Sequence, residues 1–274
     1  MTVVKRGFVD VAGGQVHYRE AGSGAPLVML HPSPGSAKML EPLLRALAAR
    51  RRVIATDTLG NGDSSPPREP APALAYFVAG HLQALDALGI ERFDLYGSHT
   101  GANIACELAI AQPGRVRRLI LDGVSLYAPA ERAEMLERYA PAVTIDHMGS
   151  QIHWIWHFVR DVYLFWPWYK RDAAHARCVG LPSPDELHDK VVEVLKAART
   201  YHLSYRAAIA YEKETRLPLV KVPTLLACAR GDMLLEYFER VQALMPAARA
   251  VVTEGTGSDA ALSATVAQFE AFLD

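Results

Sequence analysis

The sequence alternates short runs of β-branched and aliphatic residues with longer amphipathic stretches, and this alternation limits the possible folds more than any other feature. It predicts a mostly parallel sheet with helices on both faces, because parallel neighbours need a long crossover that is usually a helix. Gly13 and Gly14 separate two extended runs and indicate an opening hairpin. The expected strands are 8–11, 15–20, 26–30, 52–56, 93–96, 118–122, 224–229 and 248–252, and the expected helices are 36–50, 71–88, 100–112, 234–245 and 260–273.

One interval breaks this alternation. Residues 125–218 contain no strand pattern, and tryptophan, tyrosine, phenylalanine and histidine are concentrated there. We therefore predict an α/β fold with a mostly parallel, doubly wound sheet and a helical cap inserted before the last two core strands. The predicted domains are a core made of 1–124 and 219–274 and a cap made of 125–218.

Composition narrows the functional classes. The 29 Lys and Arg residues nearly balance the 30 Asp and Glu residues, so the net charge of −1 gives no basic surface for nucleic acid or anionic lipid. No stretch of about 18 apolar residues occurs, and no apolar segment follows the first charged residues, as a signal peptide would require. The 3 cysteines are far apart and include no C-x-x-C pair. These features predict a cytoplasmic protein without nucleic-acid or membrane partners, and they leave the oligomeric state open.

Three loops that follow expected strands carry distinctive residues. They read LHPSPGS at 30–36, DTLGNGDS at 57–64 and GSHTG at 97–101. In their order and spacing they resemble the loops of the α/β-hydrolase fold superfamily, and the resemblance covers almost the whole chain. It implies an α/β-hydrolase core with a cap, and it implies that loop 57–64 is a structural turn without a chemical role.

The third loop resembles the superfamily's nucleophile elbow, G-x-Nu-x-G, in which glycines permit a tight strand-to-helix turn. Its central residue is His99, where the family usually has a serine; Ser98 is the weaker alternative, because neighbours of the central residue point away from the pocket. The loop 253–259 lacks the histidine that the family places there, and the last histidine in the chain is His202. The resemblance therefore implies an atypical catalytic site and gives no support to a Ser-His-Asp mechanism.

Carboxylates near the elbow are candidates for orienting the His99 ring and stabilising its imidazolium form. Asp232 lies near the family's usual acid position, after the strand 224–229, and Asp122 ends the strand 118–122. Glu236 is a further alternative. It also remains open whether Asp232 only caps the helix that follows it.

The first loop resembles the family's oxyanion segment, with Pro32 where glycine is usual. The resemblance implies that the amide of Ser33 is one oxyanion-hole donor and that the amide of Thr100, at the start of the helix after the elbow, is the other. The alternative for Ser33 is that the two prolines beside it only shape a turn.

The predicted cap contributes candidates for substrate binding. His153 and His157 are four residues apart on one helical face, a spacing that can bind zinc. No third ligand accompanies them, so we predict no metal site and no cofactor. The aromatic residues of the cap are expected to form its core or the wall of an apolar pocket. The cap candidates are His153, Trp154, His157, Trp166 and Trp168.

A histidine beside an oxyanion hole can move protons at neutral pH, because imidazole titrates near pH 6.5. We therefore expect a hydrolase or lyase in which His99 cleaves a C–C or C–X bond, or activates water, in a small apolar or aromatic carbonyl compound. Direct attack by the imidazole is less favoured, since no second base remains to activate water for deacylation. The alternative function is a ligand-binding pseudoenzyme that keeps the pocket and has lost the catalytic triad.

Overall fold

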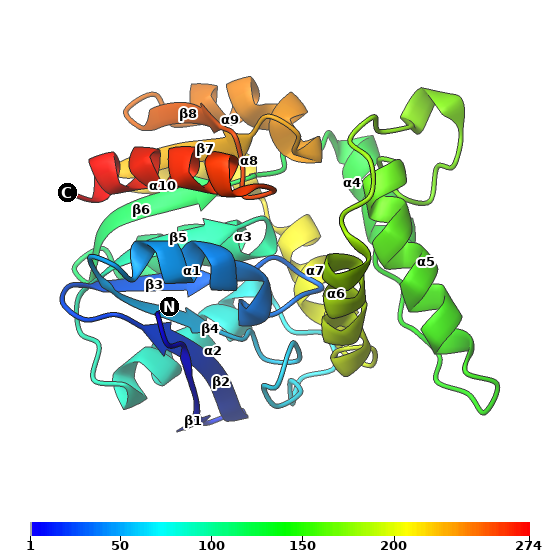
Figure 1. Ribbon diagram of the computed structural model, residues 1–274, viewed down its shortest axis with the longest axis horizontal. Coiled ribbons are helices and arrows are strands. Elements are labelled where there is room, and N and C mark those ends of the chain that lie inside the picture. Colours follow the sequence, from blue (N-terminus) through cyan, green and yellow to red (C-terminus); the bar gives the residue numbers. More distant parts are fainter. Residues whose placement is uncertain (1) are drawn as a thin grey trace.

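The computed structural model describes residues 2–274, which form one eight-stranded sheet with helices on both faces (Figure 1). The first two strands form an antiparallel hairpin, the second strand is also antiparallel to its other neighbour, and the remaining pairs are parallel. This confirms the predicted sheet. The strands are β1 (Lys5–Val11), β2 (Gly14–Ala21), β3 (Pro26–Leu30), β4 (Arg52–Thr56), β5 (Phe93–Ser98), β6 (Val116–Asp122), β7 (Thr224–Ala229) and β8 (Arg249–Thr253), in the order β1-β2-β4-β3-β5-β6-β7-β8.

Helices cover both faces of the sheet because its central strands are apolar on both sides. Strands β3 and β5 are buried along almost their whole length, as expected for strands between two helical layers. The first face packs against the short η1 (Ala37–Leu40), α1 (Glu41–Leu47) and α10 (Asp259–Leu273). The other face packs against α2 (Leu74–Ala87), α3 (Thr100–Ala111) and α9 (Phe238–Leu244), the last preceded by η4 (Met233–Tyr237). These elements match the helices expected from the sequence.

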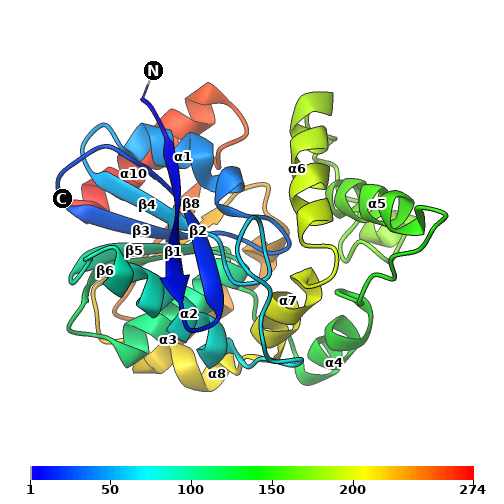
Figure 2. The same cartoon turned by 90° about the horizontal axis from the view of Figure 1, so that it is seen from below.

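The chain between β6 and β7 is helical, as predicted, and its only β-pairing is a single bridge between Phe165 and Ala176. The arrowheads of the parallel strands point toward these helices, which lie beyond one end of the sheet (Figures 1 and 2). The division into a core and a cap domain with boundaries at 125 and 218 stays a prediction. The cap helices are α4 (Pro129–Arg138), α5 (Ser150–Leu164), η2 (Ala173–His175), α6 (Pro184–Lys196), α7 (Tyr201–Ala210), α8 (Lys213–Arg216) and η3 (Leu217–Leu219).

Local sequence signals explain where some cap helices begin. At α6 the Ser183 hydroxyl accepts from the Glu186 amide and the Glu186 side chain accepts from the Ser183 amide, while Pro184 occupies the first helical position. In residues 2–274 no helix combines the length and the apolar character needed to cross a membrane.

Candidate active site

The turn between β5 and α3 consists of one residue, His99. Its backbone angles are φ 52° and ψ −110°, and no other non-glycine residue between 2 and 274 has a positive φ. Glycines on either side make this turn possible: a Cβ on Gly97 would lie 2.3 Å from the Gly101 carbonyl oxygen, and one on Gly101 would lie 2.2 Å from the Leu30 carbonyl oxygen. The His99 amide donates to the Asp122 carbonyl at 2.9 Å. The strained backbone projects the His99 ring from the edge of the sheet.

The His99 ring is paired with Asp232. Its Nε2 lies 2.7 Å from Asp232 Oδ2, and both side chains are mostly buried. The second oxygen of Asp232 accepts from the Leu234 amide at 2.8 Å, so this carboxylate caps η4 and also holds His99. Burial by itself lowers the pKa of His99, but the Asp232 carboxylate outweighs that effect and raises the pKa above 6.5. Conversely, burial by itself raises the pKa of Asp232, and His99 with the Leu234 amide holds it below its usual range.

The contact with Asp232 leaves the other ring nitrogen of His99 available. Because a carboxylate accepts, Nε2 carries the hydrogen, and the neutral ring keeps its lone pair on Nδ1. Nδ1 has no hydrogen-bond partner among residues 2–274, and the ring lines a cavity. Gly123 makes room for this ring: a Cβ there would lie 2.7 Å from His99 Cδ2 and 2.8 Å from Nε2.

Asp122, the other candidate for orienting the ring, is not the partner of His99. Its Oδ2 accepts from the Tyr96 hydroxyl at 2.7 Å, on the side of the sheet that carries Phe269. Burial raises the pKa of Asp122 to about 6, and the neighbouring Asp232 acts in the same direction. Glu236 also has a different partner, since it accepts from Trp166 Nε1 at 3.0 Å. Asp122 therefore supports the elbow through its carbonyl and not through its carboxylate.

Ser33 and Thr100, the two candidates for an oxyanion hole, line the same cavity as His99. Ser33 follows β3, and Thr100 is the first residue of α3, where helix amides have no partner within the helix. Neither amide has an acceptor among the residues that the structure describes. The Ser33 hydroxyl is bound to Ser204 of α7 at 2.9 Å, so its side chain is held by the cap.

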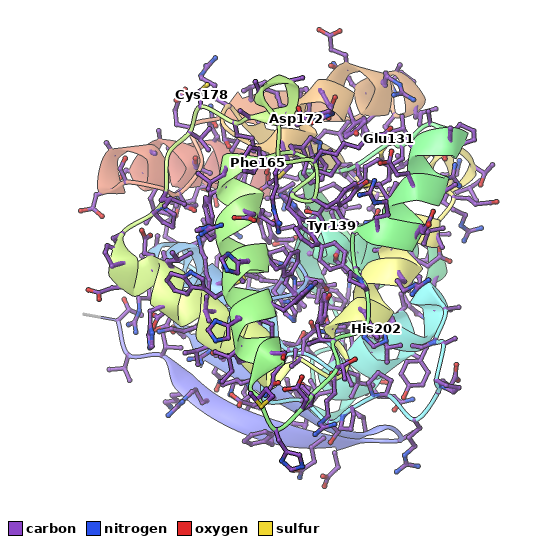
Figure 3. The ribbon with its side chains drawn as sticks, turned by 90° about the vertical axis from the view of Figure 1, so that its right-hand side faces the viewer. Glu131, Tyr139, Phe165, Asp172, Cys178 and His202 are labelled. Carbon is purple, nitrogen blue, oxygen red and sulfur yellow. The ribbon has the colours of Figure 1, made fainter. Side chains whose placement is uncertain are left out.

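The cavity has a volume of about 490 Å³ and lies between the strand ends and the cap helices. Aromatic side chains from the cap form much of its wall, and Tyr139 is at their centre: its ring centroid lies 5.4 Å from those of both Trp166 and Tyr205. In Figure 3 Tyr139 lies between α5 and α4. The aromatic residues of the wall are Tyr127, Tyr139, Phe158, Tyr163, Trp166 and Tyr205, and two cations, Arg177 and Lys190, accompany them.

Of the five cap residues predicted to bind substrate, Trp166 alone lines the cavity. His153 and His157 lie on the exposed face of α5, whereas Phe158 on the opposite face reaches the cavity, so a substrate-binding role for the two histidines stays a prediction to which this cavity lends no support. Trp154 and Trp168 are likewise absent from the cavity wall, because they pack in the core of the cap. Trp154 stacks on Phe158 at 5.1 Å, and Trp168 Nε1 donates to the Tyr139 carbonyl at 3.0 Å.

Sequence reasoning missed most of the cavity wall. Phe158, Val159 and Val162 follow the 3.6-residue period of an amphipathic helix, and this apolar face of α5 was a usable signal. Arg177 lies in the loop after η2 and Lys190 in α6, and neither position carries a sequence signal that separates it from other charged residues of the cap.

Within residues 2–274, one cluster has ligand atoms close enough to hold a metal ion: His17, Asp57 and Asp63. Hydrogen bonds account for it, because Asp57 lies 2.9 Å from His17 Nδ1 and accepts from the amides of Ala37 and Asp63 at 2.7 and 3.0 Å. These bonds use the buried carboxylate to hold the loop 57–64 against β2 and η1. We assign no metal to it.

Comparison with known proteins agrees with this architecture. A segment of this chain is 42% identical to 2-hydroxymuconate semialdehyde hydrolase of Pseudomonas sp. strain CF600 over 118 residues, which is 42% of each chain. The 2-hydroxy-6-oxononadienedioate/2-hydroxy-6-oxononatrienedioate hydrolase 2 of Pseudomonas putida is 28% identical over 84% of this chain and 78% of its own length. The crystal structure of a hydrolase from Pseudomonas aeruginosa PA01 superposes over 98% of both chains, with a TM-score of 0.75 and 23% identity. The family described as alpha/beta hydrolase fold matches residues 25–263, and the chain belongs to this family.

Proposed function

We propose that this protein is a hydrolase or lyase of small carbonyl compounds in which His99 is the general base, Asp232 orients it, and the amides of Ser33 and Thr100 bind the developing oxyanion. The observation that carries the proposal is the 2.7 Å contact between His99 Nε2 and Asp232 Oδ2, which leaves Nδ1 as a basic nitrogen in a cavity. The aromatic wall favours an apolar or aromatic substrate body. The relatives named above are hydrolases of small organic molecules.

The hydrolytic form of the reaction balances with groups that the chain supplies. A water molecule attacks the substrate carbonyl carbon while His99 Nδ1 takes one of its protons, and Asp232 stabilises the imidazolium that forms. The carbonyl oxygen becomes negatively charged and accepts from the Ser33 and Thr100 amides. The tetrahedral intermediate collapses, the bond to the leaving group breaks, and the imidazolium returns its proton to that group. Cleavage of a C–C bond differs only in that the leaving carbon takes this proton.

The test compares turnover by the wild type with that of His99→Ala and Ser98→Ala. The substrates are aryl esters and 1,3-diketones with aromatic substituents, followed by absorbance. Removing the base should lower kcat/KM by about 10²-fold or more, while Ser98→Ala, one residue away in β5, should retain activity. Equal turnover by wild type and His99→Ala refutes the assignment of His99.

A protein that binds these compounds in the cavity with no turnover of any of them fits the alternative, a ligand-binding pseudoenzyme. If an ester instead labels Ser98 covalently and the protein loses activity as a result, the nucleophile is Ser98, one residue before His99.

A further inference from the structure

Two cations in the cavity wall have no role in the chemistry proposed above. Arg177 comes from the loop after η2 and Lys190 from α6, and both side chains are half-buried. Among residues 2–274, neither has a nitrogen within 4 Å of a carboxylate, although most partly buried arginines and lysines of this chain have such a partner. A cation that is removed from water usually needs a carboxylate partner to compensate the lost solvation, so two half-buried cations without one are unusual.

The neutral groups around these cations hold them but leave donors free. Arg177 Nη1 donates to the Val162 carbonyl at 2.6 Å and Nη2 to the Gly231 carbonyl at 2.9 Å, which uses two of the five guanidinium N–H groups. Lys190 Nζ is bound to the Tyr163 hydroxyl, which uses one of its three donors, and lies 4.8 Å from that ring's centroid. Since Val162 and Tyr163 are consecutive, both cations are fixed at the C-terminal turn of α5, beside the cavity.

The charge balance of the cavity favours one added negative charge. Two carboxylates line it, Asp232 and Glu254. Asp232 is the partner of His99, and Glu254 is exposed to solvent and its charge is paired with Arg230 at 3.3 Å. Two cations facing the single Asp232 charge leave a surplus of about one positive charge, which matches a monoanion better than a dianion. Arg177 also binds the carbonyl of Gly231, next to Asp232, so the surplus lies close to the proposed base.

We propose that Arg177 and Lys190 form a subsite for a carboxylate within the active-site cavity, so that the substrate is a carbonyl compound that also carries a carboxylate. The assignment of the carbonyl rests on the proposed function. The carboxylate assignment rests on the unpaired cations alone and can be tested by binding.

The experiment measures Kd by isothermal titration calorimetry for two probes of the same shape, 4-phenylbutanoate and 4-phenylbutanamide, at pH 8 and low salt. A hydrogen-bonded charge pair should make the wild type bind the carboxylate about 10-fold tighter than the amide. In Lys190→Met this preference should fall by several-fold, and Lys190→Arg should restore it. Lys196→Met is the matched control: it removes the same charge from α6 outside the cavity, where Lys196 pairs with Asp63 and Glu193, and it should keep the preference.

Arg177→Gln should also reduce the preference for the carboxylate. Because this variant also removes the hydrogen bond from Arg177 to the Gly231 carbonyl, which joins the cap to the core, Lys190→Met is the deciding variant. Wild type that binds the amide as well as the carboxylate, or that binds neither probe, overturns the proposal. An unchanged preference in Lys190→Met overturns it too. Because these readouts do not involve turnover, a protein that prefers the carboxylate and has no activity would refute the proposed function and leave the carboxylate subsite in place.

Discussion

Gly123 offers a way to move the His99 ring without changing either catalytic candidate. A Cβ at this position would lie 2.7 Å from His99 Cδ2, 2.8 Å from Nε2 and 3.4 Å from Asp232 Oδ2. Ordinary carbon contacts are about 3.5–4.0 Å, so Gly123→Ala should displace the ring by roughly 1 Å and weaken its contact with Asp232. A displacement of that size can cost about 10²-fold in rate. We expect kcat/KM to fall by that order and the pKa of His99 to fall, because Asp232 is what raises it.

The control for this variant is Gly89→Ala. Gly89 has φ 67°, against 68° for Gly123, but a Cβ there would meet nothing within 4 Å. Both variants should therefore lose about 1–2 kcal/mol of stability from the positive φ, as measured by urea unfolding. Only Gly123→Ala should change the pKa of His99, which is measured by an NMR titration of the protein with labelled histidine. Identical His99 titrations and activities in the two variants would refute the placement of the ring.

Three further predictions test other parts of the account. Phosphonates that trap serine hydrolases should leave the protein unlabelled in intact-mass spectra; a stoichiometric adduct on Ser98 would contradict the elbow assignment. Trp166→Ala should weaken binding of an aromatic ligand by about 10-fold in a fluorescence titration, because Trp166 lines the cavity. Trp156→Ala should leave this affinity unchanged, since Trp156 is 40% exposed on the outside of α5. Equal effects of the two variants would contradict the assignment of Trp166 to the cavity wall. Burial lowers the pKa of Lys213 from 10.5 to about 7. Between about pH 7 and pH 10 the unfolded chain therefore binds one more proton at Lys213 than the folded chain does, so the free energy of unfolding of the wild type, measured relative to Lys213→Met, should rise with pH in this range. A difference that does not change with pH would mean that Lys213 stays charged in the folded protein.

The fold was predictable because the signals that specify it are local. The eight strands follow from short apolar runs, and each loop at the catalytic edge carries its own turn residues, so Gly97 and Gly101 are enough to indicate the elbow. The start of α6 is equally local, since Ser183, Pro184 and Glu186 form its cap.

The cap side of the cavity was not predictable in the same way. The apolar period of α5 indicates which of its faces is buried, but whether that face lines a cavity depends on its packing against the distant α6, and the conspicuous residues His153 and His157 lie on the exposed face. Whether Asp232 or Asp122 pairs with His99 likewise depends on residues far apart in the sequence. The Tyr96 hydroxyl of β5 donates to the Asp122 carboxylate of the neighbouring β6, so this carboxylate is already engaged. Arg177 and Lys190 lie beside the same turn of α5 only in the folded cap, because their partners Val162 and Tyr163 belong to α5 whereas Arg177 follows η2 and Lys190 is in α6.

The central claim is that neutral His99, held by Asp232, is the base, and the pH dependence of kcat/KM tests it most directly. The folded-state pKa of His99 is raised, so activity should be low where the ring is protonated and should rise with pH through a value above 6.5. In Asp232→Asn the carboxylate that raises this pKa is gone, so the rise should move to lower pH while the plateau falls by about 10²-fold or more. A profile whose rise stays at the same pH in Asp232→Asn, with an undiminished plateau, would contradict the account.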